Sequence, residues 1–112
     1  MLDIAFRIKK IGKTFNSAAA LQKAYGDRMA RVIMLRLAVL KAARTLTLVP
    51  ITRPERRHQL QGDRDEQFAV DLIHPHRLVF EPNHEPPPRK NDGGIDTDQV
   101  TAIMIIDVID YH

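Results

Sequence analysis

The pattern of apolar and polar positions predicts a strand and two helices in the first part of the chain. Apolar residues alternate with small or basic ones over 4–8, which is the period of a half-buried strand. The pair Asn16-Ser17 can cap an Ala-rich segment that ends at a glycine, so we expect a short helix over 18–25. A longer segment, 28–44, consists of strong helix formers, and its apolar residues circle most of the axis. We expect this second helix to pack on a sheet and also against another surface.

The second part of the chain has the pattern of strands. Alternation over 68–72, a His-Pro-His turn at 74–76 and the run at 77–81 predict a β-hairpin. The segment 82–98 has no period and contains consecutive prolines and glycines, which predicts a long flexible loop. An apolar run over 102–109 predicts a final buried strand. We therefore expect an α+β fold in which an N-terminal strand and two helices pack on one face of an antiparallel sheet, leaving the other face for function.

Length and composition narrow the class of protein. A chain of 112 residues with 44% apolar and 28% charged residues fits one globular domain spanning 1–112. The sequence has no run of about 18 apolar residues that would cross a membrane, and its start lacks the pattern of a secretory signal. We expect a cytoplasmic protein that does not contact a membrane. Since the chain contains no Cys, disulfides, thiolate nucleophiles and Cys-ligated zinc are excluded. As a separate prediction, we expect no cofactor.

Charge is distributed unevenly along the chain. Residues 1–64 contain 14 Lys and Arg against 4 Asp and Glu, whereas residues 65–112 contain 3 against 10. A basic half favours a polyanionic partner, because neutralising phosphates releases counterions. The candidate RNA-binding side chains are Arg53, Arg56, Arg57 and Arg64. The alternative is a solvated basic face beside an acidic one in the same fold.

The chain ends in Asp110-Tyr111-His112, directly after the apolar run. A carboxylate, a phenol and an imidazole at the end of a rigid strand can together orient and transfer protons. The alternative is that the tyrosine covers the edge of a core and the terminal histidine lies in solvent.

Three segments share a spacing with a known family. Residues 57–63 are Arg-His-Gln-Leu-Gln-Gly-Asp, residues 68–81 contain Phe-Ala-Val-Asp-Leu and His-Arg-Leu-Val-Phe-Glu, and residues 106–112 are Ile-Asp-Val-Ile-Asp-Tyr-His. Together they resemble the HigB group of the RelE toxin superfamily, the plasmid maintenance killer proteins of bacterial toxin–antitoxin pairs. The resemblance implies a RelE-like fold and a ribosome-dependent endoribonuclease that cleaves messenger RNA and is inhibited by a cognate antitoxin.

The resemblance assigns five catalytic positions. RNA cleavage without a metal needs a base for the 2′-hydroxyl, positive charge at the phosphate and an acid for the departing 5′-oxygen. Either His58 or His112 can be base or acid; we expect His112 to be the base and His58 its partner, with the reverse open. Arg77 suits a phosphate clamp. Tyr111 can stack on a base or donate a proton, and Asp110 can orient an imidazole.

The sequence departs from the family pattern at three places. The family lysine before the glycine is Gln61 here, so a phosphate-binding cation is missing or is supplied by Arg57 or Arg64. An Asn-Trp pair is replaced by Pro75-His76, which removes an aromatic ring and adds an imidazole. The loop at 82–98 is enlarged, which can hinder docking to the ribosome.

Each candidate also has a plain structural interpretation. His58 can simply hydrogen-bond a loop carbonyl, and Arg77 can form a cross-strand ion pair with Glu81 or Asp71. The turn histidines are a poor ligand set without acidic or Cys partners, so we do not expect a metal site. These histidines are His74, His76 and His84.

Two other functions remain open from the sequence. One is a non-catalytic RNA- or protein-binding module on the same fold, which the loss of the lysine and the aromatic ring would favour. The other is an oligomeric scaffold, a homo-oligomer that associates through the apolar helix at 28–44. A toxin would instead have messenger RNA on the ribosome and a helix-turn-helix antitoxin as its partners.

Overall fold

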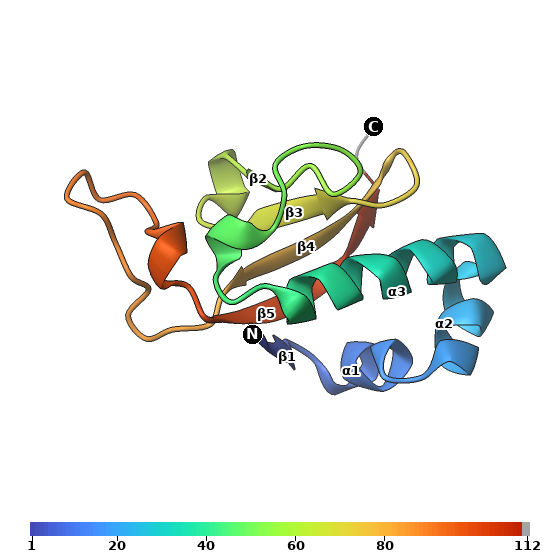
Figure 1. Ribbon diagram of the computed structural model, residues 1–112. Coiled ribbons are helices and arrows are strands. Elements are labelled where there is room, and N and C mark those ends of the chain that lie inside the picture. The colour runs from blue at the N-terminus through green and yellow to red at the C-terminus, as the bar shows by residue number, and fades with distance from the viewer. Residues whose placement is uncertain (111–112) are drawn as a thin grey trace.

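A five-stranded sheet and three helices make up the fold of the computed structural model, which describes residues 1–110 (Figure 1). The helices are α1 (Lys9–Phe15), α2 (Ala18–Tyr25) and α3 (Asp27–Ala42). The strands are β1 (Asp3–Phe6), β2 (His58–Gln59), β3 (Phe68–Asp71), β4 (His76–Pro82) and β5 (Ala102–Asp110). Short 3-10 turns lie at Leu46–Leu48, Gly62–Arg64 and Thr97–Gln99. The strand order in the sheet is β1-β5-β4-β3-β2.

The sheet is mixed, which differs from the expected antiparallel sheet. β1 pairs with β5 in parallel, with Ile4 opposite Ile103, whereas the other neighbours are antiparallel. A strand pattern predicts extended backbone but not the direction of a partner about a hundred residues away in the sequence. The α+β class is confirmed, and the N-terminal strand occupies one edge of the sheet.

The helical region contains α1 in addition to the two expected helices. α2 has the expected bounds because the Ser17 hydroxyl accepts a hydrogen bond from the Ala20 N–H at 3.1 Å, at the first turn. α1 has no side-chain cap and is only seven residues long, so its own sequence gives a weak helix signal. Tertiary packing explains its presence, since Phe15 packs edge-to-face on Phe6 and on Tyr25 with ring centroids 5.8 and 6.4 Å away.

α3 covers one face of the sheet with an apolar stripe that includes Ile33, Leu37 and Leu40. Leu35 is 56% exposed, and other apolar residues of this helix pack at the margin of the core. The apolar surface around α3 is thus largely used within the chain. In residues 1–110, no helix combines the length and apolar character needed to span a membrane.

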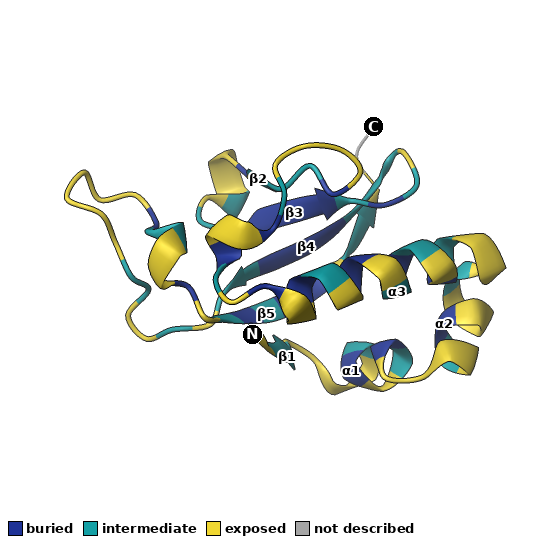
Figure 2. Cartoon of the chain, viewed as in Figure 1, coloured by how far each residue is buried: buried dark blue, intermediate teal, exposed yellow. Residues whose placement is uncertain are grey.

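The two faces of the sheet are covered to different extents (Figure 2). The helix-covered face holds the main core, in which Phe68 and Phe80 stack with centroids 6.2 Å apart. The other face carries only a small cluster, closed by Leu60 from the segment between β2 and β3. This second cluster consists of Leu60, Ala69, Val79 and Ile106, with Met104 and Ile109 at its margin. On this second face no helix of residues 1–110 covers the sheet beside the Leu60 cluster.

The segment 82–98, expected to be a long loop, connects β4 to β5. Within it, Arg89 and Ile95 form an isolated antiparallel bridge, and Ile95 is buried. The Arg89 guanidinium donates hydrogen bonds of 2.6 and 2.9 Å to the two carboxylate oxygens of Glu66. This pair connects the long loop to the segment between β2 and β3.

Candidate functional site

The strand register brings His58 and Arg77 to the same face of the sheet. His58 on β2 lies opposite Ala69 on β3, and Ala69 lies opposite Val79 on β4. Residues paired across strands share a face, and residues two apart on one strand do so too. His58 and Arg77 therefore both lie on the face without helices. The structure thus brings together two of the five predicted catalytic residues.

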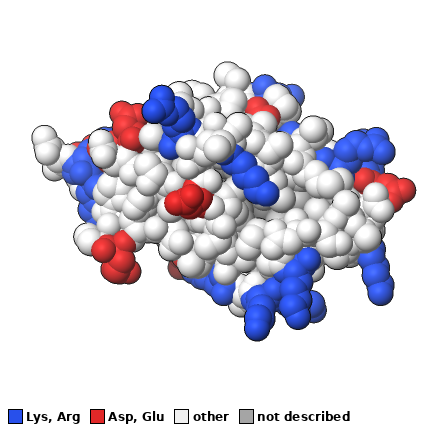
Figure 3. All heavy atoms as spheres, turned by 60° about the horizontal axis from the view of Figure 1, so that its bottom comes forward, with Lys and Arg blue, Asp and Glu red and all other residues white. Residues whose placement is uncertain are grey.

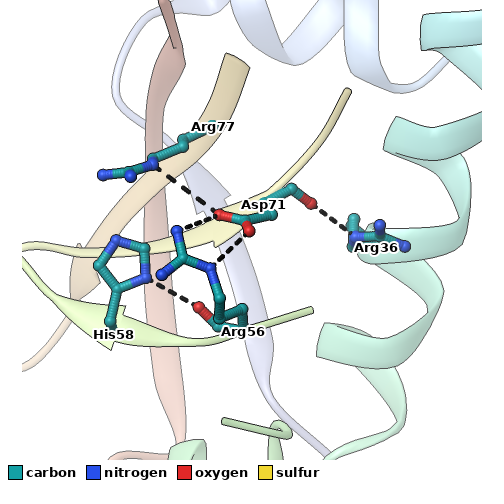
Figure 4. A network of polar contacts seen from close by, with 5 residues as sticks. All are labelled: Arg36, Arg56, His58, Asp71 and Arg77. Atoms are coloured by element: carbon teal, nitrogen blue, oxygen red, sulfur yellow. Dashed lines mark hydrogen bonds and ion pairs between the residues drawn. The ribbon is translucent and has the colours of Figure 1, made fainter. Parts of the chain in front are cut away.

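Asp71 lies between these two strands and contacts three arginines (Figure 4). Its carboxylate accepts two hydrogen bonds from Arg56, at 2.6 and 3.1 Å. Arg77 Nε is 3.8 Å from the same carboxylate, directly across the β3–β4 ladder. The Asp71 carbonyl oxygen accepts a 2.6 Å hydrogen bond from Arg36 Nε on α3. Hydrogen bonding and the negative charge of Asp71 raise the pKa of the Arg56 guanidinium above its ordinary value.

The His58 ring has one engaged nitrogen and one free nitrogen. Its Nδ1 is 2.8 Å from the carbonyl oxygen of Arg56. A carbonyl only accepts hydrogen bonds, so Nδ1 carries the hydrogen, and Nε2 of the neutral ring has the lone pair. Nε2 is enclosed and has no hydrogen-bond partner among residues 1–110. Burying an acceptor unpaired costs about 1–3 kcal/mol, so this nitrogen is the atom of the ring left to accept a hydrogen bond from a group that gains access to it.

The structural contacts that the sequence offered as alternatives to function for His58 and Arg77 are both present. His58 does bond a loop carbonyl, and Arg77 does form a cross-strand ion pair with Asp71. Glu81, the other candidate partner, instead pairs with Arg7 at 2.9 Å. These contacts fix the direction of both side chains and leave His58 Nε2 unused.

Asp110, the third predicted catalytic residue that the structure describes, lies apart from His58 and Arg77. It is opposite His76 in the β4–β5 ladder, and its carboxylate is 3.9 Å from His76 Nε2. The next pair along on that side, Leu78 and Val108, faces the helix-covered core. By strand alternation Asp110 therefore lies on the opposite side of the sheet from Arg77. The remaining candidates, Tyr111 and His112, lie outside the described residues.

The four arginines predicted to bind RNA have different environments. Arg57 Nε donates to the Val49 carbonyl at 3.0 Å, and burial lowers the pKa of its guanidinium. Arg56 is held by the ion pair described above, and Arg64 donates to the side chain of Gln67 at 3.1 Å. Arg53 is exposed and makes no hydrogen bond or ion pair within the described chain.

The surface view shows how the charges are arranged on one face (Figure 3). Lys and Arg side chains gather at its lower edge, but Asp and Glu groups are interspersed over the rest of it. The strong separation of charge along the sequence is therefore not repeated as one uniformly basic surface on this face.

The turn histidines do not form a metal-binding group in the described residues. No cluster of three or more His, Asp or Glu side chains suited to a metal is found within 1–110. His84 Nε2 accepts a hydrogen bond from the Thr101 N–H at 3.1 Å, and His76 lies beside Asp110.

Two residues of this site were not among the predicted functional residues. The sequence predicts Asp71 only as an ion-pair partner of Arg77, although its carboxylate is the centre of the network. Arg36 occupies the buried stripe of α3 between Ile33 and Leu37 and is only 9% exposed. A charged residue within an apolar helical stripe needs a buried partner, and that is the sequence signal that would have identified it.

Comparisons of this chain with protein-family models, with curated proteins and with solved structures find no match. The functional assignment therefore depends on the residues of the site and their geometry.

Proposed function

We propose that this protein is a ribosome-dependent messenger RNA endoribonuclease that acts as the toxin of a toxin–antitoxin pair. The proposal combines the family resemblance of the three sequence segments with the arrangement on the open sheet face. The observation that supports it most directly is the His58 ring, whose Nδ1 is fixed by the Arg56 carbonyl and whose Nε2 has no partner within 1–110.

The chemistry requires a base that removes the proton of a ribose 2′-hydroxyl. The 2′-oxygen then forms a bond to phosphorus while the bond from phosphorus to the 5′-oxygen breaks, giving a 2′,3′-cyclic phosphate and a 5′-hydroxyl. The lone pair on His58 Nε2 suits the base role once RNA binding opens access to this enclosed atom, and this reverses the assignment we expect from the sequence. His112, by the family resemblance, then supplies the proton to the departing oxygen.

Arg77 suits the stabilisation of the phosphate as its charge grows during this step. Its guanidinium lies on the same face as His58 and is partly exposed. Asp71 is hydrogen-bonded to Arg56 and lies 3.8 Å from Arg77, so it can orient the Arg77 guanidinium without a short hydrogen bond. A guanidinium oriented in advance offers paired donors to phosphate oxygens at little reorganisation cost.

The partners follow from the same proposal. The substrate is messenger RNA on a translating ribosome, and the inhibitor is an antitoxin whose acidic segment suits the basic first half of the chain. We expect this antitoxin to be a small helix-turn-helix protein encoded beside this chain.

The test is cleavage of a reporter messenger RNA by the purified protein, with and without translating ribosomes. Primer extension maps new 5′ ends, and end-group analysis identifies the cyclic phosphate. We expect cuts only with ribosomes, and we expect His58→Gln to lower the cleavage rate about 100-fold or more, because general base catalysis contributes that much. Unchanged cleavage by His58→Gln would refute the role of this ring.

A matched control is available in the same chain. His84→Gln changes a histidine beyond the far end of β4 from Arg77 and keeps an acceptor for the Thr101 N–H. We expect this variant to cleave at the wild-type rate.

A non-catalytic RNA-binding module is the second candidate. Arg53 is exposed and makes no hydrogen bond or ion pair within the described chain, so it is available to a phosphate whether or not His58 acts as a base. RNA retention without any new 5′ ends would support this candidate over the nuclease.

A further inference from the structure

A polar cavity opens at the end of β3, next to the network around Asp71. It has a volume of about 500 Å³ and lies between α3 and the segment before β2. Its lining residues are Arg36, Arg53, Pro54, Arg56, Asp71, Leu72 and His74. Three guanidinium groups and one imidazole therefore surround the cavity, against a single carboxylate.

Arg36 is the most informative residue of this cavity. It is only 9% exposed, and its Nε is bonded to the Asp71 carbonyl at 2.6 Å. Its two terminal nitrogens have no hydrogen-bond partner among the described residues. They are also not enclosed by protein, because the only enclosed side-chain atom without a partner in 1–110 is His58 Nε2. Arg36 lines the cavity with these donors unused, so they are available to an anion that enters it.

The other charges in the cavity favour the same kind of ligand. The Asp71 carboxylate is hydrogen-bonded to Arg56, which offsets the charge of that one arginine. Arg36 and Arg53 then remain as positive charges without a carboxylate partner in 1–110. Guanidinium groups bind phosphate oxygens through paired N–H donors, which makes phosphate the chemical group that fits this lining.

We propose that this cavity binds a phosphate group of the RNA strand, one that is not the phosphate being cleaved. The inference rests on the proposed nuclease function. Asp71 connects the two places, because its carboxylate contacts the arginines on the face of His58 while its carbonyl orients Arg36 (Figure 4). A strand bound at both places would be held on either side of Asp71. This contact would position the RNA but take no part in the bond changes.

The test measures RNA binding without cleavage. A short 2′-O-methyl RNA, which lacks the attacking hydroxyl, and inorganic phosphate are each titrated into the full chain while the His74 imidazole signals are followed by NMR. We expect both probes to shift these signals. We expect Arg53→Gln to weaken RNA binding about fivefold, because it removes one exposed charged contact. The slope of log affinity against log salt should fall by about 0.7.

Two further variants keep the result interpretable. Arg36→Lys keeps a positive charge but removes the paired donors, and we expect it to weaken RNA binding as Arg53→Gln does. Arg31→Gln removes the same charge from an exposed position of the same helix, and we expect it to bind RNA as the wild type does.

The outcomes separate this proposal from the nuclease proposal. Equal RNA affinity and salt slope for Arg53→Gln, Arg36→Lys and Arg31→Gln would overturn the cavity as an RNA site. Phosphate binding that RNA does not compete with would overturn it too, because the cavity would then take free phosphate. If RNA binding depends on Arg53 and Arg36 but no cleavage is found, the cavity proposal stands and the nuclease proposal fails.

Discussion

Replacing Asp71 by Asn tests whether the network around this carboxylate holds the site together. The substitution keeps the shape of the side chain but removes its charge. It weakens two hydrogen bonds from Arg56, at 2.6 and 3.1 Å, and the 3.8 Å ion pair with Arg77. The amide oxygen can still accept one of the two hydrogen bonds, so the loss is partial.

The magnitude follows from the exposure of these groups. Hydrogen bonds to charged groups contribute about 1.5–3 kcal/mol when they are shielded from water, and exposed ion pairs about 0.2–1 kcal/mol. The Arg56 and Asp71 side chains are 41% and 27% exposed, which places this pair between the two limits. We expect Asp71→Asn to lower the free energy of unfolding by about 1 kcal/mol, equivalent to a decrease in Tm of roughly 4 °C for a domain of this size.

The same substitution should affect the position of His58. Arg56 has φ of 47°, a left-handed conformation that costs a non-glycine residue about 1 kcal/mol or more. Its ion pair with Asp71 offsets this cost, and its carbonyl holds the Nδ1 of His58. When the pair is weakened, residue 56 can relax toward negative φ and release the ring. We expect cleavage to fall about tenfold.

Urea unfolding of Asp71→Asn, Arg56→Gln and the double variant gives the coupling free energy directly. We expect a coupling of about 1 kcal/mol. A coupling below about 0.3 kcal/mol, within the error of additivity, would refute the energetic role of the pair. Arg56→Gly serves as the backbone control, because glycine adopts positive φ freely and should retain more cleavage than Arg56→Ala.

Three further predictions concern the fold. Phe80→Ala should lower the free energy of unfolding by about 3–5 kcal/mol in urea, because the ring is fully buried, and a smaller loss than from Phe80→Leu would contradict the packing. Gly12→Ala should raise the free energy of unfolding by about 0.5–1 kcal/mol, since the added methyl meets Phe6 at an ordinary 3.4 Å inside α1, and a decrease in Tm would show that the contact is too tight. Burial and the charge of Asp107 raise the pKa of Tyr25, so stability should fall as pH rises above 10, where the unfolded phenol ionises first. Tyr25→Phe should remove both that loss and the late-ionising phenolate absorbance, and an unchanged titration would refute the assignment.

The parts of the fold that the sequence predicts are those specified by local chemistry. α2 begins after the Ser17 cap and ends before a glycine with φ of 83°, and both signals are adjacent in the sequence. α1 could not be predicted in this way, because Phe15 holds it through contacts with Phe6 and Tyr25 rather than through capping. The parallel pairing of β1 depends on a distant strand and leaves no mark in the local pattern.

For the candidate site too, the local sequence pattern predicts some features, and others depend on contacts between distant residues. Alternation along the strands predicts a face for Arg77, and the structure brings His58 to that face through the short pairing of β2 with β3. The order of contacts around Asp71 could not be predicted, because two of its partners are 15 and 35 residues away in the sequence. Whether another cation replaces the family lysine at Gln61 could not be predicted either, because the answer depends on where the surrounding arginines lie in the folded chain.

Asp71 explains why the site and the cavity should be considered as one unit. A strand residue directs its side chain to one face, but its carbonyl lies in the plane of the sheet and is free for another partner at an edge. Here β2 pairs with only the first two residues of β3; at Asp71 the backbone N–H donates to the Glu55 carbonyl at 2.8 Å, and the Asp71 carbonyl is left to a side-chain partner. The side chain is thus available to Arg56 and Arg77, and the carbonyl to Arg36. A shift of this one residue would change the direction of guanidinium groups on both sides, so the two proposed phosphate contacts are coupled through the backbone of β3.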